Sequence, residues 1–350
     1  MSVMNLVSLF SGAGGLDLGF ENAGFKVVWA NEYDKTIWDT YRKNFPHTEL
    51  ETRSITEVDA SEVPDCDGII GGPPCQSWSE AGELRGIGDR RGQLFFEYIR
   101  LLEELRPKFF LAENVSGILF SRHSAAVEEI LGRFTRLGYN VSYGLLNANA
   151  YGVPQDRERV IIVGYQSGYG KFFVPPAPDD VGPTLKDAIW DLRQTAIPAE
   201  EPGSRSKRSH IANHEFMTGG FSSIYMSRNR VRNWNQPSFT IQAGARHAPL
   251  HPQAPPMPLV GKDVRIFAPG FEHLYRRLTV RECARIQTFP DNHEFVYGNV
   301  VNGYKMVGNA VPVEFARRIA RVIADDLGRA RRTHKSRTGL IRRFDELVGD

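Results

Sequence analysis

The sequence has little cysteine, no long apolar run and almost no net charge. Three cysteines occur in 350 residues, without the paired spacing of a zinc site, so neither disulfide bonds nor structural zinc are expected. No run of residues is long and apolar enough to span a membrane. Residues 1–5 lack the basic and apolar regions of a signal peptide. These absences predict a cytoplasmic protein that binds no metal.

The composition predicts a soluble globular chain with a local excess of basic residues. Hydrophobic residues make up 41% and charged residues 24% of the chain, which is long enough for one large domain and a smaller one. The net charge of +2 does not by itself indicate a polyanion partner. However, ten Lys and Arg residues lie between Arg317 and Arg343, opposed by Asp325 and Asp326. This excess fits either a solvated helix face with a loose tail or a phosphate-binding surface.

The first forty residues have the pattern of a nucleotide-binding unit. Residues 5–10 predict a buried strand, Ser-Gly-Ala-Gly-Gly at 11–15 predicts a turn, and an apolar helical pattern follows. A second strand, residues 27–31, ends at Glu32, and an acidic residue there can accept hydrogen bonds from a ribose. Alternatively, Glu32 caps a surface helix. The glycine turn alone also fits a nicotinamide dehydrogenase.

A second pattern presents a cysteine at the end of a strand. Residues 67–70 predict a buried strand that Gly71-Gly72-Pro73-Pro74 ends abruptly, so Cys75 lies on a stiff turn. Taken alone, it could equally be an inert core cysteine. Residues 77–92 are rich in Gly, Ser and Arg and predict either a mobile loop that closes over a polyanion or a plain linker.

Later strands carry further polar side chains. A strand at 109–112 leads into Glu113-Asn114-Val115, and strands near 141–146 and 160–163 complete the sheet. Between these two strands lies Gln-x-Arg-x-Arg, with Arg157 and Arg159. Alternate residues of a strand face the same way, so both arginines could serve one site, or they could lie at a solvated edge.

The character of the chain changes near residue 174. Prolines predict a linker there, and the segment to about residue 281 predicts a small, irregular second domain. Its polar stretches at 204–208, 227–234 and 238–247 are rich in residue types that contact bases and phosphates. Thr279 and Glu282 have capping-box spacing at the start of a helix. Residues 308–312 open a last helix that runs to about residue 328.

Six motifs occur in a fixed order, and that order resembles the DNA (cytosine-5) methyltransferases. They are Phe-Ser-Gly-x-Gly-Gly, Pro-Pro-Cys-Gln, Glu-Asn-Val, Gln-x-Arg-x-Arg, Arg-Leu-Thr-x-Arg-Glu and Gly-Asn-x-Val, with a variable segment between the fourth and fifth. The sequence also resembles that of the bacterial modification enzymes specific for GGCC at three segments, which are Ser-Trp-Ser-Glu-Ala-Gly, Ser-Arg-Asn-Arg-Val and residues 250–255.

The resemblance implies an α/β fold: a doubly wound, Rossmann-like methyltransferase sheet with a second, smaller and irregular target-recognition domain. Residues 1–177 and 296–330 would form the catalytic domain. Residues 178–295 would form the target-recognition domain with its hinge, and residues 331–350 a basic tail.

It also implies S-adenosyl-L-methionine as the methyl donor. The positions that would contact this donor are Phe10, Gly12, Gly14, Gly15, Leu16, Glu32, Ser54, Ile55, Asn309 and Val311. Ser54 stands where the family usually has an Asp against the adenine amino group, and a serine accepts a hydrogen bond more weakly.

The implied chemistry assigns roles to four residues. The Cys75 thiolate would add to C6 of cytosine, so that C5 becomes nucleophilic. Glu113 would donate a proton to ring N3, Arg159 would hold O2, and Arg157 would lie near Cys75 and favour the thiolate. A water would remove the C5 proton. Because none of this is feasible inside a stacked duplex, the base must be flipped out.

The resemblance implies double-stranded DNA as the partner of a monomer, with a cognate restriction endonuclease acting on the same site. Ser79, Arg228, Arg230 and Arg246 would contact DNA, and the likeness weakens after Arg246, so a related GC-rich site also fits. A tRNA cytosine-5 methyltransferase is an alternative, opposed by the sizeable variable domain. A non-catalytic DNA-binding protein on the same fold is another, opposed by intact Cys75.

Overall fold

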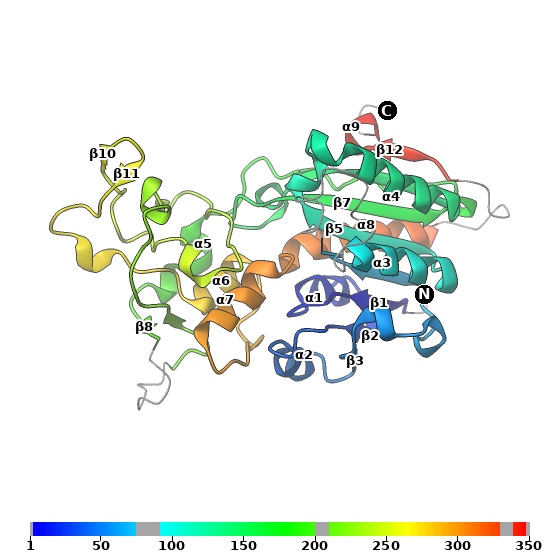
Figure 1. The fold of residues 1–350 in the computed structure, drawn as a ribbon, viewed down its shortest axis with the longest axis horizontal. Helices are drawn as coiled ribbons and strands as arrows, with labels where there is room; N and C mark the ends of the chain where they lie inside the picture. Colours follow the sequence, from blue (N-terminus) through cyan, green and yellow to red (C-terminus); the bar gives the residue numbers. More distant parts are fainter. Residues whose placement is uncertain (1–2, 75–91, 200–209, 330–338, 348–350) are drawn as a thin grey trace.

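The computed structural model describes residues 3–74, 92–199, 210–329 and 339–347. They form two lobes, which Figure 1 shows side by side. The larger lobe is built on one sheet with helices on both faces. The smaller lobe consists mostly of loops with short helices. Within these ranges, no helix is long and apolar enough to cross a membrane.

The sheet of the large lobe has eight strands in the described chain, in the order β12-β6-β7-β5-β4-β1-β2-β3. Only β7 runs antiparallel to its neighbours β5 and β6. The strands are β1 (Asn5–Leu9), β2 (Lys26–Asn31), β3 (Glu49–Glu51), β4 (Gly68–Gly71), β5 (Phe109–Val115), β6 (Tyr139–Asn147), β7 (Glu158–Gln166) and β12 (Ile341–Arg343). The chain leaves β1 in one direction to β2 and β3, then returns to β4 on the other side. Such a switch point leaves a crevice at the carboxyl ends of the strands.

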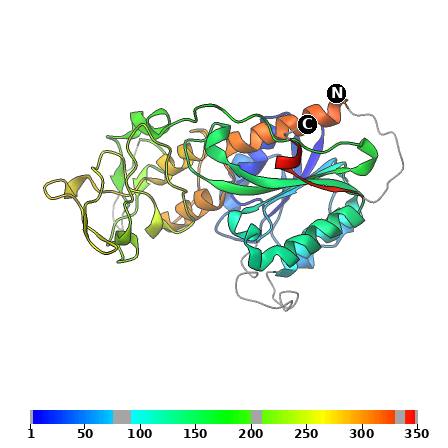
Figure 2. The same cartoon turned by 90° about the horizontal axis from the view of Figure 1, so that it is seen from above.

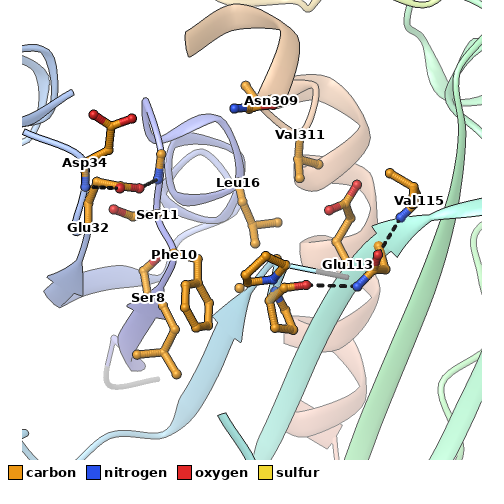
Figure 3. Close-up of a pocket in the computed structure, with 18 of the residues that line it drawn as sticks. Ser8, Phe10, Ser11, Leu16, Glu32, Asp34, Glu113, Val115, Asn309 and Val311 are labelled. Carbon is orange, nitrogen blue, oxygen red and sulfur yellow. Dashed lines mark hydrogen bonds between the residues drawn. The ribbon is translucent and has the colours of Figure 1, made fainter. Parts of the chain in front are cut away.

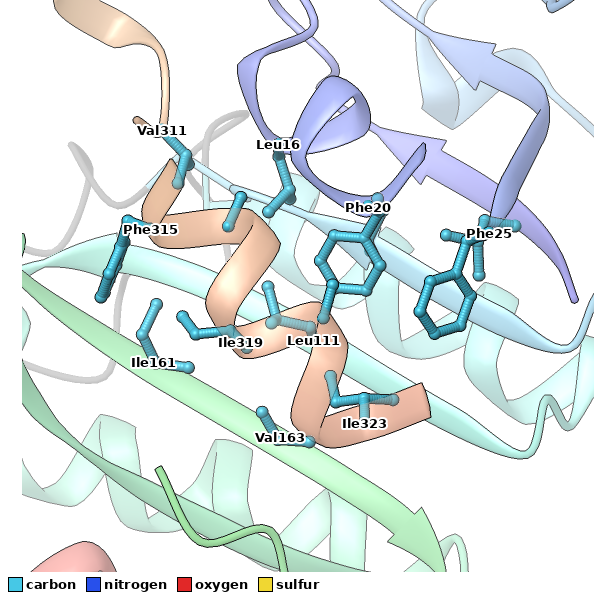
Figure 4. Packing of buried hydrophobic residues seen from close by; sticks show 14 of the residues in the cluster. Leu16, Phe20, Phe25, Leu111, Ile161, Val163, Val311, Phe315, Ile319 and Ile323 are labelled. Atoms are coloured by element: carbon cyan, nitrogen blue, oxygen red, sulfur yellow. The ribbon is translucent and has the colours of Figure 1, made fainter. Parts of the chain in front are cut away.

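Helices cover both faces of this sheet, as Figures 1 and 2 show from two directions. The helices are α1 (Gly15–Glu21), α2 (Trp38–Asn44) and α8 (Val313–Arg329) on one face, and α3 (Gly92–Leu105) and α4 (Ser124–Arg136) on the other. Phe20 of α1 and Ile319 of α8 meet over Leu111 of β5 in a fully buried cluster (Figure 4). Gly19 permits this approach, because a Cβ there would lie 2.4 Å from the Cβ of Ala316. The predicted doubly wound sheet is confirmed.

The C-terminal segment differs from the prediction. The sequence analysis predicted a basic tail over 331–350 and left open whether it is loose. Residues 339–347 rejoin the large lobe. Here β12 extends the sheet parallel to β6, and α9 (Phe344–Leu347) follows it. Phe344 is 6% exposed and packs on Phe173 and against Gly144. The prediction was wrong because arginines surround a single apolar anchor, so the segment has no clear periodicity.

The smaller lobe contains few regular elements. They are α5 (Leu185–Ile189), α6 (Val280–Ile286), α7 (Val300–Asn309) and two short pairs, β8 (Ile197–Pro198) with β9 (Glu215–Phe216) and β10 (Leu259–Gly261) with β11 (Val264–Arg265). The sequence analysis predicted that the chain returns to the catalytic domain at residue 296, which lies before α7. However, Tyr304, Met306 and Val307 of α7 share a buried cluster with α5 and α6. The chain therefore returns to the large lobe between α7 and α8.

Buried arginines hold the loops of this lobe together. Arg277 donates to the carbonyls of Met217, Gly219 and Gly220, and its guanidinium carbon lies 4.0 Å from the ring centre of Phe221. A guanidinium carries five donors, so one side chain can satisfy several carbonyls that lack partners in a regular ladder.

The Arg-Leu-Thr-x-Arg-Glu motif is explained by these contacts and by the start of α6. Arg281 donates to the carbonyls of Ala212, Pro290 and His293. The predicted capping box is confirmed, because Thr279 accepts from the Glu282 backbone and Glu282 accepts from the Thr279 backbone. The motif thus has a structural role.

The anchoring of the C-terminal segment can be tested by Phe344→Ala. Loss of a buried aromatic side chain should lower the free energy of unfolding by roughly 2–4 kcal/mol, measured by urea denaturation. The control is Arg343→Ala, since the Arg343 side chain is 60% exposed and should shift stability little. Equal stability of Phe344→Ala and the wild type would mean that β12 and α9 are not bound to the sheet in solution.

Candidate active site

A cavity of about 580 Å³ opens at the carboxyl ends of β1, β2, β4 and β5. The turn between α7 and α8 forms part of its wall. Figure 3 shows Glu32 and Asp34 at one end, Glu113 and Val115 at the other, and Leu16 between them. The lining residues include Phe10, Gly12, Leu16, Asp17, Glu32, Asp34, Gly72, Pro73, Pro74, Glu113, Asn114, Arg122, His123, Asn309 and Val311.

The turn after β1 gives the cavity an open backbone surface. Phe10 has a φ of 56°, which is uncommon for a non-glycine residue. Gly12 also has a φ of 56°, and no atom lies within 4 Å of the position its Cβ would take. A ligand can therefore approach this backbone closely.

The two glycines that follow have a packing role. A Cβ at Gly14 would lie 2.1 Å from the ring of Phe45, and a Cβ at Gly15 would lie 2.3 Å from the carbonyl oxygen of Val311. Neither Gly14 nor Gly15 lines the cavity. Both glycines allow α1 to pack closely against its neighbours, and their contact with the methyl donor stays a prediction.

Glu32 is fixed at one end of the cavity by backbone donors. Its Oε2 accepts from the Gly12 N–H at 2.9 Å and its Oε1 from the Asp34 N–H at 2.7 Å. Burial raises the pKa of Glu32 above its usual value. Asp34, which the sequence analysis did not single out, also lines the cavity and forms an ion pair with Lys305 of α7. This end of the cavity is acidic.

Ser54 and Ile55 lie apart from the cavity lining. The Ser54 hydroxyl forms a hydrogen bond with the Thr56 hydroxyl at 2.8 Å, and the Ile55 side chain is 1% exposed in the core. Leu16, Asn309 and Val311 line the cavity, and their contact with the methyl donor stays a prediction.

Asp17 is a site residue that the sequence analysis missed. It is fully buried on α1, and it accepts from Ser8 Oγ at 2.5 Å and Tyr41 Oη at 2.6 Å. Burial raises its pKa to about 7, although the two hydroxyl donors act in the opposite direction. An acidic residue on the apolar face of a predicted helix was the available signal.

The other end of the cavity is formed by β5 and the turn after β4, and Glu113 of β5 is paired there with Arg159 of the neighbouring strand β7. Arg159 Nε lies 2.7 Å from Glu113 Oε1, and both side chains are 12% exposed. A Cβ at Gly72 would lie 3.1 Å from Glu113 Oε2, so this glycine leaves the carboxyl group room. Asn114 Nδ2 donates to the Pro73 carbonyl at 2.9 Å and fixes the turn that leads to Cys75. Cys75 itself lies outside the described residues, as does Ser79.

Arg157 does not have the position that its spacing predicted. It precedes β7, is 1% exposed, and donates to the carbonyls of Ile241, Gly308 and Ala310 at 2.9–3.0 Å. Burial lowers its pKa to about 9. Its terminal nitrogens are thus occupied by backbone oxygens, which gives Arg157 a structural role. Its predicted effect on the Cys75 thiol stays a prediction, because Cys75 lies outside the described residues.

The three arginines predicted to read DNA differ in how they are held. Arg228 and Arg246 are exposed and have no hydrogen bond or ion pair to any described residue. Arg230 donates to the carbonyls of Tyr225 and Ile224, and its guanidinium carbon lies 4.8 Å from the Tyr225 ring centre. Arg228 and Arg246 therefore keep all their side-chain donors available.

Comparison with known proteins adds a family to this geometry. The family described as C-5 cytosine-specific DNA methylase matches residues 4–325. The type II methyltransferase M.FnuDI of Fusobacterium nucleatum is 55% identical over 93% of this chain and 95% of its own length. M.NgoPII of Neisseria gonorrhoeae, also a type II methyltransferase, is 54% identical over 93% and 97%.

A solved structure supports the fold alone. The Entamoeba histolytica methyltransferase EhMeth has a TM-score of 0.68 at 16% identity, over 93% of this chain and 99% of its own. Among the described residues, no group of His, Cys, Asp and Glu is arranged to hold a metal ion.

The buried Asp17 predicts a pH dependence of stability. Its folded-state pKa of about 7 lies above the ordinary 3.8, so between these values the folded state binds the extra proton. The stabilising contribution is therefore present in acid and is lost as pH rises towards 7. Between pH 5 and pH 8, the melting temperature of the wild type should fall further than that of Asp17→Asn.

Asp39→Asn is a suitable control because Asp39 is exposed on α2. Thermal melts followed by circular dichroism at both pH values measure the difference. Identical pH dependence in wild type and Asp17→Asn would contradict the assignment.

Proposed function

Because this chain belongs to the C-5 cytosine-specific DNA methylase family, we propose that it methylates C5 of one cytosine within a short GGCC-like site in duplex DNA. The chain is a DNA cytosine-5 methyltransferase of the type II kind, which belongs to restriction–modification systems. The observation that carries the proposed chemistry is the Glu113–Arg159 pair, 2.7 Å apart, at the end of the cavity next to the turn that leads to Cys75.

The acidic end of the cavity suits S-adenosylmethionine, which members of this family use as methyl donor. Glu32 offers carboxylate oxygens to ribose hydroxyls, while Phe10, Leu16 and Val311 offer apolar contacts. The open backbone at Gly12 leaves room for the ligand. Bound here, the donor supplies a methyl group as an electrophilic sulfonium.

The opposite end suits the edge of a pyrimidine. Arg159 uses Nε for Glu113 and Nη1 for the Glu158 carbonyl, so Nη2 is the donor that remains for the O2 of cytosine. Since Arg159 is bonded to Oε1, Oε2 of Glu113 stays accessible beside Gly72 and can donate to N3 once it is protonated.

Cys75 follows Pro74, which lines the cavity. In the proposed reaction, a bond forms between the Cys75 sulfur and C6, and N3 gains a proton from Glu113, so that C5 becomes an enamine carbon. Attack of C5 on the sulfonium methyl breaks the methyl–sulfur bond and releases S-adenosylhomocysteine. Loss of the C5 proton to water, with return of the N3 proton to Glu113, then expels the thiolate and restores the aromatic ring. The cavity lies at the ends of strands, so the target base must leave the helical stack to reach it.

The proposal can be tested by methyl transfer. We expect tritiated methyl groups to pass from S-adenosylmethionine to unmethylated duplex DNA and not to tRNA. Cys75→Ala should abolish transfer, while a duplex carrying 5-fluorocytosine at the target should trap the wild type covalently. Transfer by Cys75→Ala at near wild-type rate would refute the mechanism, and transfer to tRNA alone would refute the substrate.

We further propose that the chain acts as a monomer on double-stranded DNA, alongside an endonuclease specific for the same site. Site reading is assigned to Arg228 and Arg246, because arginine pairs bidentately with guanine in the major groove. Arg230 keeps Nη1 for a contact, since its Nε and Nη2 are bonded to carbonyls.

Substitution separates base contacts from phosphate contacts. Arg228→Ala and Arg246→Ala should each cost about 1–3 kcal/mol of binding and relax one position of the site, measured by sequencing the methylated products. Arg193→Ala is a matched control, because Arg193 is bonded to the Trp190 carbonyl and lies over its ring. A uniform loss across all sequences would show that these arginines hold phosphates.

A further inference from the structure

Two basic residues in the cavity wall have no part in the chemistry proposed above. After β5, the turns η5 (Ser116–Leu119) and η6 (Ser121–His123) lead the chain to α4. They bring Arg122 and His123 into the lining of the same cavity that Glu113 and Val115 line.

His123 is the buried member of this pair. Its residue is 6% exposed, and its Nε2 accepts from Arg122 Nε at 3.0 Å. Burial and the charge of Arg122 both lower the pKa of His123, so the neutral ring is favoured. Because Nε2 accepts this hydrogen bond, the ring proton is assigned to Nδ1. The imidazole thereby fixes the direction of the guanidinium.

Arg122 is the exposed member. Its guanidinium carbon lies 5.2 Å from the ring centre of Phe120, and Nε is bonded to His123. Neither Nη1 nor Nη2 has a partner in the described parts of the chain, and no carboxylate there pairs with this side chain. The two terminal nitrogens lie in one plane, and the hydrogen bond between Nε and His123 fixes their direction. They can therefore donate to two oxygens of a phosphate group.

The charges of the lining residues indicate that Arg122 is available to bind an anion. The acidic lining residues are Asp17, Glu32, Asp34 and Glu113, of which Asp34 is paired with Lys305 and Glu113 with Arg159. Among the lining residues of the described chain, Arg122 is the permanent cation. It follows β5 in the chain and lines the same cavity as Glu113 and Val115, two residues that Figure 3 shows at the end opposite Glu32 and Asp34.

We propose that Arg122 binds a backbone phosphate of the DNA strand that carries the flipped cytosine, with His123 as its positioning residue. This inference rests on the proposed function. A cytosine held against Glu113 carries a phosphate on each side of its sugar, and these groups must lie outside the base pocket, at its solvent-exposed rim. Arg122 is exposed at that rim, whereas a carboxylate of the methyl donor would bind inside the cavity.

The salt dependence of DNA binding is the most direct test. Each phosphate contact contributes about −0.9 to the slope of log K against log salt, so Arg122→Ala should make the slope less negative by about that amount. At 0.1 M salt, its affinity for a cognate duplex should fall by about tenfold. Fluorescence anisotropy with full-length protein between 50 and 200 mM NaCl measures both. Arg122→Lys should keep most of the slope.

Arg136→Ala is the matched control, since Arg136 is also an exposed arginine next to a helix end of α4 but pairs with Glu129. It should leave both slope and affinity at wild-type values. His123→Ala should raise the KM for DNA with a smaller change in kcat, and His123→Gln, which retains an acceptor, should restore part of the loss. Thermal melts identify any variant that fails to fold.

Three outcomes are decisive. A wild-type slope and affinity in folded Arg122→Ala would overturn the inference. Weakened S-adenosylmethionine binding, measured by calorimetry, with unchanged DNA binding would assign Arg122 to the donor carboxylate and also overturn it. Failure of the wild type to methylate any DNA would instead refute the proposed function. The two results are distinguishable, because the salt titration measures DNA binding and does not depend on methyl transfer.

Discussion

The buried guanidinium of Arg157 is the contact on which the junction of the two lobes depends. It joins the start of β7 to the Ile241 loop of the small lobe and to the turn between α7 and α8, through the carbonyls of Gly308 and Ala310. That turn carries Asn309 and Val311 into the cavity wall. A buried cation without a carboxylate is costly, and the lowered pKa of Arg157 reflects this burial. The three carbonyl dipoles offset the cost, so one side chain sets the position of one wall of the site.

The small lobe contains further buried arginines that donate to backbone carbonyls. Arg277 and Arg281 are 2% and 0% exposed, and their donors meet carbonyls of loops that have no strand partner. An irregular chain leaves such carbonyls unpaired, and each would be expensive to bury alone. Arginines in this lobe therefore divide by environment. Buried ones hold loops, while exposed ones without partners in the described chain, such as Arg228 and Arg246, retain free donors.

The sequence predicted strands β1, β2 and β4 to β7 and the motifs that end several of them, because buried apolar runs followed by glycine or proline are local signals, but it did not predict β12. It could not distinguish the roles of Arg157 and Arg159. Alternate spacing places two side chains on one face only within a strand, and β7 begins at Glu158, so Arg157 escapes that rule. Asp17 and Arg122 were missed for a related reason. The contact of Asp17 with Tyr41 spans 24 residues of sequence, and the place of Arg122 in the cavity wall follows from the turns after β5, so both become evident only when the chain is folded.

The distribution of charge along the cavity matches two ligands of opposite sign. Glu32 lies at one end beside Asp34, which is paired with Lys305, and the Glu32 carboxyl group suits a cationic sulfonium and the hydroxyls of its ribose. At the other end, Arg159 neutralises Glu113, so a neutral base can lie there without meeting an uncompensated charge. Arg122, also in the lining, adds an exposed positive charge, which suits the proposed contact with an anionic backbone. This distribution of charge follows from the order of strands at the switch point. The acidic residues Glu32 and Asp34 follow β2, whereas Glu113 lies on β5 and Arg122 follows β5 in the chain.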